Sequence, residues 1–96
     1  MARVVVTPAA AEDLARLIAT HSLPPDTTER VKRSLRPLAD FPLLGAPLEA
    51  RWERFRFILG PWRWMVILYV VDEARATVAI VTVQDGRSFR APTSSS

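Results

Sequence analysis

The sequence predicts an α+β fold in which an N-terminal strand and a two-helix hairpin precede a three-stranded antiparallel meander, with the helices on one face of the sheet. Apolar residues recur at helical spacing in the first half of the chain, and apolar and polar residues alternate in the second half. Turn signals divide the second half into three strands. The 96 residues suffice for one domain, which we expect over residues 1–90, followed by a polar tail over residues 91–96.

The first strand and the first helix are separated by a sharp change of residue type. Residues 2–6 include three consecutive valines and are typical of a strand. Thr7 and Pro8 then form a helix-start signal, because a hydroxyl group caps free backbone donors and proline suits the first helical position. We therefore predict a helix over residues 9–20. Its apolar stripe consists of Leu14, Leu17 and Ile18.

A second helix is predicted to begin at residues 26–29, whose Asp-Thr-Thr-Glu pattern resembles a capping box. Its apolar face consists of Val31, Leu35 and Leu38. Pro37 lies inside this pattern and either ends the helix near Leu35 or kinks it, because proline removes a backbone donor and clashes with the preceding turn. Residues 40–50 contain two prolines and a glycine, so we expect a loop there.

The second half of the chain predicts strands over residues 52–59, 62–71 and 77–83. A glycine–proline pair at 60–61 marks the first turn, and residues 72–75 mark the second. The third strand is apolar on both faces, as expected near the centre of a sheet.

An even-numbered turn at 60–61 pairs Leu59 with Trp62 and Arg56 with Met65, and cross-strand partners point to the same side of a sheet. With this register one face is apolar throughout, and we expect the helices to cover it. Its members are Phe55, Phe57, Leu59, Trp62, Trp64, Val66, Leu68 and Val70. The opposite face gathers basic and amphipathic aromatic side chains and is expected to face outward. Its members are Trp52, Arg54, Arg56, Arg63 and Tyr69.

The charge of the chain is dominated by arginine: 13 basic residues, all but Lys32 arginine, face 10 acidic residues, for a formal net charge of +3. Guanidinium groups on one face repel each other unless an anion joins them, and arginine grips phosphate in a bidentate manner. The basic face is therefore a candidate anion or partner site, with Trp52 and Tyr69 as stacking platforms. The alternative is an open sheet face in water, whose charge Glu53 or Asp85 partly neutralises.

Composition excludes several classes of site. Without cysteine there is no disulfide, thiolate zinc site, iron–sulfur site or cysteine nucleophile, and with His21 as the single histidine there is no multi-histidine metal site. We expect neither a metal nor a cofactor. No apolar run reaches the roughly 18 residues that span a bilayer, and the N-terminus lacks the apolar run of a signal peptide, so we expect a cytoplasmic protein without membrane contact. His21 is expected to end the first helix.

Four segments resemble the RelE/ParE superfamily of bacterial toxins: Ala39–Gly45, Arg54–Arg63, the turn at Asp72–Glu73 and Val83–Arg87. The resemblance covers about residues 3–90. It implies a toxin of a type II toxin–antitoxin pair. RelE-like members cut messenger RNA in the ribosomal A site by attack of the ribose 2′-hydroxyl, and ParE-like members act on DNA gyrase. An antitoxin silences both kinds, and the complex usually represses its own operon by binding operator DNA.

The resemblance also implies roles for individual residues. Arg54 and Arg56 match the basic pair on the second strand of RelE-like toxins, Arg63 the arginine after the hairpin, and Arg87 the arginine after the last strand. As catalytic residues these four clamp the scissile phosphate, transfer protons and stabilise the charge of the pentacoordinate phosphorus. Substrate-binding residues are expected among their aromatic and basic neighbours. These are Trp52, Tyr69, Phe89 and Arg90.

Cleavage of messenger RNA on the ribosome is the first expectation from the resemblance, and two alternatives stay open. RelE-like enzymes commonly have lysine where Arg56 stands, and arginine is a poor general base. Phe89 can stack but cannot transfer a proton. The alternatives are a ParE-like toxin that inhibits DNA gyrase without being an enzyme, and a degenerate toxin that keeps only antitoxin binding. An antitoxin is expected to place a helix in an apolar groove or to add a strand to the sheet, with its acidic groups against the arginines.

Overall fold

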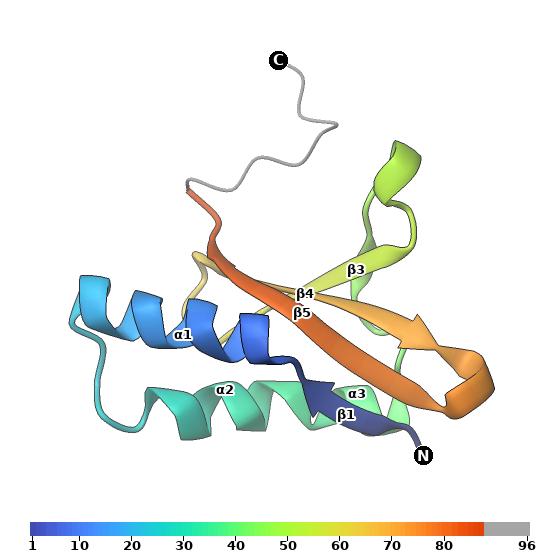
Figure 1. The fold of residues 1–96 in the computed structure, drawn as a ribbon, viewed down its shortest axis with the longest axis horizontal. Helices are drawn as coiled ribbons and strands as arrows, with labels where there is room; N and C mark the ends of the chain where they lie inside the picture. The colour runs from blue at the N-terminus through green and yellow to red at the C-terminus, as the bar shows by residue number, and fades with distance from the viewer. Residues whose placement is uncertain (88–96) are drawn as a thin grey trace.

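A computed structural model describes residues 1–87 as one five-stranded sheet with its helices on one side (Figure 1). In chain order the elements are β1 (Arg3–Val6), α1 (Pro8–His21), α2 (Thr27–Leu35), α3 (Pro37–Asp40), β2 (Ala46–Pro47), the 3-10 turn η1 (Ala50–Trp52), β3 (Phe55–Leu59), β4 (Met65–Asp72), the 3-10 turn η2 (Glu73–Arg75) and β5 (Thr77–Asp85). The predicted α+β order is confirmed.

The sheet has the strand order β1-β5-β4-β3-β2. The antiparallel meander β3-β4-β5 agrees with the prediction, and β1 adds to it in parallel beside β5, with Arg3 next to Thr77. The sheet is therefore mixed. The very short strand β2 adds to the other edge beside β3. The loop between α3 and β2 therefore begins beside the start of β1, where the Ala2 amide donates to the Ala39 carbonyl, and ends at the opposite edge of the sheet.

The helix boundaries follow from local chemistry. The Thr7 hydroxyl accepts a hydrogen bond from the amide of Ala10 at 3.2 Å and donates to the carbonyl of Ile80 at 2.8 Å, so it caps α1 and ties the helix to the sheet. The expected Asp26 cap of α2 does not form; the Asp26 carboxylate pairs with Arg30 instead. α2 ends at Leu35, and Pro37 begins α3, as the proline indicated.

The hairpin register and the buried face differ from the prediction. Leu59 pairs with Val66 and Arg56 with Tyr69, because the hairpin loop is four residues longer than a tight turn at 60–61. The shift is even, so residues of β3 and β4 that were predicted to share a face still do, whereas Trp62 and Trp64 lie in the hairpin loop and pack against the covered core. The helices nevertheless cover the opposite face, that of Met65 and Tyr69, and Leu59 is 48% exposed. Both faces of these strands are apolar, so alternation alone did not distinguish the covered face from the open one.

The core lies between the two long helices and the inner face of β4 and β5. Its buried members are Ala10, Leu14, Val31, Leu35, Leu38, Met65, Ile67, Tyr69, Val78, Ile80 and Val83. Within residues 1–87, none of the helices combines the length and apolar character needed to cross a bilayer.

Candidate functional site

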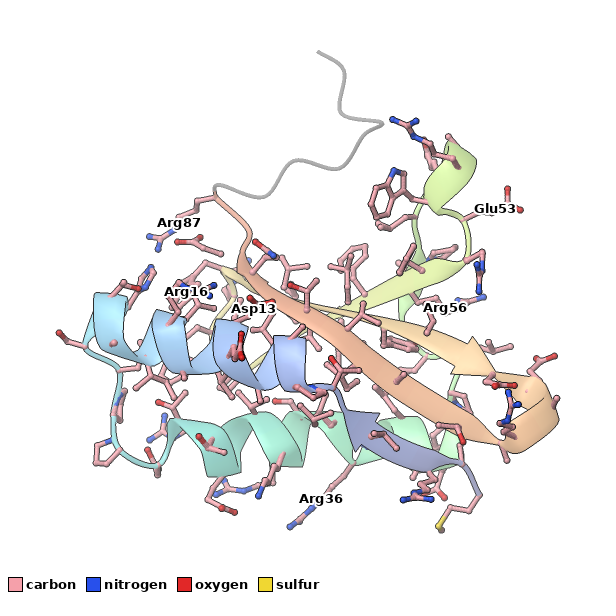
Figure 2. All side chains as sticks on the ribbon, in the orientation of Figure 1. Asp13, Arg16, Arg36, Glu53, Arg56 and Arg87 are labelled. Carbon is pink, nitrogen blue, oxygen red and sulfur yellow. The ribbon has the colours of Figure 1, made fainter. Side chains whose placement is uncertain are left out.

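The four arginines of the predicted catalytic site do not converge. Arg54 directly precedes β3, Arg56 lies within it, and Arg63 lies in the hairpin loop that follows. Because the five residues of β3 span about 17 Å, Arg54 and Arg63 lie at opposite ends of the strand. Figure 2 shows Arg56 and Arg87 well apart. Arg56 and Arg87 therefore do not lie together, and a phosphate site shared by all four arginines stays a prediction.

Arg56 is engaged by the backbone of a neighbouring loop. Its Nη1 atom donates to the carbonyl of Gly45 at 2.6 Å and to the carbonyl of Leu43 at 3.2 Å. Hydrogen bonds from a charged donor are stronger than those between neutral groups. The Arg56 guanidinium therefore holds the loop before β2 through its Nη1 atom.

Tyr69 holds the same loop from inside the core. The side chain is fully buried, so the prediction of an exposed stacking platform is wrong. Its hydroxyl donates to the carbonyl of Pro42 at 2.8 Å and accepts from the amide of Gly45 at 2.7 Å. Burial raises the pKa of the Tyr69 hydroxyl, against the lowering effects of the Gly45 amide and the Arg56 charge, so the proton that it donates stays in place at neutral pH. We refer to Arg56 and Tyr69 as the loop anchor, and to Phe41–Leu44 as the apolar loop.

Arg63 and Arg87 lie close together at the hairpin end of the sheet. The Gly86 amide donates to the Trp64 carbonyl, which extends the β4–β5 pairing by one step and brings the two arginines to the same end. Arg63 is exposed and makes no hydrogen bond or ion pair within residues 1–87. Arg87 binds both carboxylate oxygens of Asp85, at 3.0 and 2.8 Å, and lies over the Trp64 ring at 5.2 Å. Asp85 therefore neutralises much of the Arg87 charge.

His21, expected to be only the end of a helix, joins this group. Its Nε2 atom lies 3.1 Å from the Asp85 carboxylate, and its ring stacks on Trp64 with centroids 4.7 Å apart. Its Nδ1 atom faces the carbonyl of Leu17 at 3.2 Å. No sequence pattern indicates this contact, because His21 and Asp85 are 64 positions apart. His21, Trp64, Asp85 and Arg87 form what we call the hairpin-end cluster, which ties α1 to the sheet.

Stability at acidic pH is expected to depend on Asp85. The hydrogen bonds from Arg87, and then that from His21, hold the pKa of the Asp85 carboxyl well below its usual value. A carboxyl group whose pKa is lower in the folded state stabilises the fold at pH values above its unfolded-state pKa of about 3.9. This stabilisation is lost as the pH falls towards the folded-state pKa. Asp85→Asn should be less stable than the parent near pH 6, and the difference should shrink below about pH 4. Thermal unfolding across this pH range measures it, and a constant difference would contradict it.

The remaining predicted residues lie apart from both groups. Trp52 is half-buried and packs on Phe55 with ring centroids 5.2 Å apart, and its indole N–H is buried without a partner within residues 1–87. Arg54 is exposed and makes no hydrogen bond in this part of the chain. Phe89 and Arg90 lie outside the described residues.

Edge strand β1 borders a groove of mixed apolar and basic character. The amides of Arg3 and Thr7 donate towards β5, so the intervening amides of Val4 and Val6 point to the open edge. We call the recess beside them the β1-edge groove; its volume is about 370 Å³. Its lining residues are Val4, Val6, Lys32, Leu35, Arg36 and Ala39. A second recess, almost wholly apolar, lies between α1 and α2 and shares Val6, Lys32 and Leu35 with it. Figure 2 shows Arg36 pointing outward beside α2.

Comparisons with known proteins agree on a small toxin fold. The family model described as the ParE toxin of type II toxin–antitoxin system, parDE, matches residues 4–88. The toxin–antitoxin complex RelBE2 of Mycobacterium tuberculosis contains a chain that is 27% identical, with a TM-score of 0.65 and coverage of 88% of this chain and 96% of that one. The intact RelBE complex of E. coli gives 14% identity, a TM-score of 0.68, and coverage of 94% and 100%. A conserved hypothetical protein of Helicobacter pylori, HP0892, gives 13% identity, a TM-score of 0.60, and coverage of 91% and 97%. No curated protein sequence matches significantly.

Proposed function

Since the chain belongs to the family of ParE toxins of type II toxin–antitoxin systems, we propose that it arrests growth by binding a target protein, DNA gyrase, and not by cutting RNA. The observation that supports this proposal is that Arg56 and Arg87, which a phosphate-cleaving site would need in one place, bind different protein groups: loop carbonyls and the Asp85 carboxylate. A binding toxin needs a complementary surface and no assembled acid–base groups.

RNA cleavage requires an arrangement of donors and proton-transfer groups that differs from the contacts described above. Attack of a 2′-hydroxyl on phosphorus requires donors that converge on the oxygens of one phosphate and a group that takes up a proton. Arg56 is engaged by loop carbonyls and Arg87 by Asp85, and Arg54 lies a strand length away from Arg63. Both ring nitrogens of His21 face protein groups. These contacts favour binding over catalysis.

We further propose a cognate antitoxin that occupies the β1-edge groove. The outward amides of Val4 and Val6 can pair with an added strand, and Lys32 and Arg36 attract its acidic side chains. The apolar recess between α1 and α2 continues from this groove and suits an amphipathic helix of the same partner. The M. tuberculosis relative was solved as a toxin–antitoxin complex, which supports a partner of this kind.

Expression of the chain alone in bacteria is expected to stop growth while messenger RNA stays intact. Mapping of message 5′ ends should show no new in-frame cuts, and the purified protein should block supercoiling by DNA gyrase. Co-expression of the protein encoded by the adjacent reading frame should restore growth. New in-frame cuts that depend on translation would contradict the proposal and favour RNA cleavage on the ribosome. A chain that binds the neighbouring gene product but never slows growth would favour a degenerate toxin.

A further inference from the structure

Three large apolar side chains project into water from the apolar loop. Phe41 is 63% exposed, Leu43 55% and Leu44 56%, and the loop joins α3 to β2. Single exposed apolar residues are common on protein surfaces, but adjacent exposed large ones mark interaction sites. The side chains contribute little to the core, so their position needs a reason other than folding.

The backbone of the apolar loop is held in place, although its side chains are exposed. The Tyr69 hydroxyl bonds Pro42 and Gly45, and Arg56 bonds the carbonyls of Leu43 and Gly45. The loop is therefore fixed at Pro42, Leu43 and Gly45 by a fully buried tyrosine and by a charged donor. A segment that is already ordered loses less conformational entropy when a partner binds. The loop anchor thus presents the apolar loop in a preorganised form.

A recess of about 330 Å³ lies directly beside the apolar loop. Pro42 and Leu43 line it from the loop, and Val71 lines it from the end of β4. Two carboxylates, those of Asp40 and Glu73, also border it. Both residues are exposed, and neither carboxylate has a hydrogen bond or an ion pair within residues 1–87. Met1, the N-terminal residue, also lines the recess, whose charged side chains are those of Asp40 and Glu73.

We propose that the apolar loop and this acid-bordered recess form the surface that binds the target protein, through a segment of the target that carries an apolar side chain next to a basic one. The apolar side chain would enter the recess against Leu43, and the basic group would meet Asp40 and Glu73. Phe41 and Leu44 would pack around it as apolar anchors. This inference rests on the proposed function and names the surface and the partner chemistry that it uses.

Charge separates this surface from the β1-edge groove. The groove carries Lys32 and Arg36, and the recess carries Asp40 and Glu73. An acidic segment that suits the groove is repelled at the recess, and a basic segment is repelled at the groove. The two neighbouring surfaces therefore select partners of opposite charge, which assigns the groove to the antitoxin and the recess to the target.

The test compares the double variant Leu43→Ser/Leu44→Ser with the charge variant Asp40→Lys/Glu73→Lys. Both are expected to reduce affinity for purified DNA gyrase, measured by surface plasmon resonance, by about tenfold or more, and to relieve growth arrest at equal soluble expression. Binding to the adjacent gene product should change less than about threefold. Leu59→Ser, at a leucine that is 48% exposed on the open face of the sheet, is the matched control and should behave as the parent.

The outcomes separate this inference from the proposed function. If both variants arrest growth like the parent, or if they lose the antitoxin as strongly as the target, the assignment of the surface is overturned. If circular dichroism shows that the leucine variant does not fold, the charge variant alone tests the assignment of the surface, because both of its substituted positions are exposed. If the parent arrests growth without binding gyrase, gyrase is the wrong target. In that case the assignment of the surface is still tested by whether the two variants relieve growth arrest. A parent that arrests no growth overturns both proposals.

Discussion

Replacement of Gly45 by alanine is expected to lower the free energy of unfolding by about 3 kcal/mol, the upper part of the usual range for overpacking. A Cβ atom at this position would lie 2.5 Å from the carbonyl oxygen of Phe57 and 2.7 Å from the hydroxyl oxygen of Tyr69. The carbonyl is backbone of β3 next to β2, and the tyrosine is fully buried, so neither can move without loss of packing. Gly45 is thus required for close approach, since its φ is not positive.

Chemical denaturation of Gly45→Ala and of the matched control Gly60→Ala measures this effect. The nearest atom to a Cβ at Gly60 is the sulfur of Met65, which is as buried as Tyr69 but belongs to an unbranched, flexible side chain that adjusts more readily than a tyrosine ring or a backbone carbonyl. The loss at Gly60 should therefore be clearly smaller. Equal losses, or a Gly45→Ala variant as stable as the parent, would mean that the loop can shift away from the sheet, and the loop anchor would not be rigid.

The order of the elements could be predicted because it depends on short-range patterns. Thr7 and Pro8 begin a helix through their own hydrogen-bonding and dihedral properties, and Pro37 separates α2 from α3 for the same reason. The alternation in β3 also placed Arg56 and Tyr69 on one face, and they are cross-strand partners. Local chemistry determines these features, so no knowledge of distant contacts was needed.

The covered face and the candidate site depend on long-range contacts and escaped prediction. The open face of β3 and β4 carries Phe57 and Val66, which are as apolar as the covered Ile67, so hydrophobicity did not identify the side that the helices take. Alternate arginines along a strand looked like one cluster, but the longer hairpin and the loop carbonyls gave Arg56 and Arg63 different surroundings.

The role of Tyr69 and the contact of His21 with Asp85 also lay beyond the sequence patterns. Each depends on a partner brought close by the fold: the loop at Gly45 for the tyrosine and the end of β5 for the histidine. The sequence signal for the role of Tyr69 was a tyrosine on an otherwise apolar strand, because a buried hydroxyl needs hydrogen-bond partners.

Replacement of Arg56 by methionine is expected to cost about 1–3 kcal/mol of unfolding free energy, because the carbonyls of Gly45 and Leu43 lose a charged donor. The amide of Gly45 should exchange its hydrogen faster, and growth arrest should weaken as the apolar loop loses its preorganisation. Arg56→Lys should recover part of the stability, since an ammonium can reach one of the two carbonyls.

Arg54→Met is the matched control, because the resemblance assigns Arg54 and Arg56 to one basic pair while their surroundings differ. Arg54 is exposed and lacks a partner within residues 1–87, so its replacement should change the unfolding free energy by less than about 0.5 kcal/mol. A phosphate-binding pair predicts the opposite result, in which both variants lose toxicity equally and neither loses stability. Denaturation and growth assays on Arg54→Met, Arg56→Met and Arg56→Lys therefore distinguish an arginine that positions a loop from one that binds a phosphate.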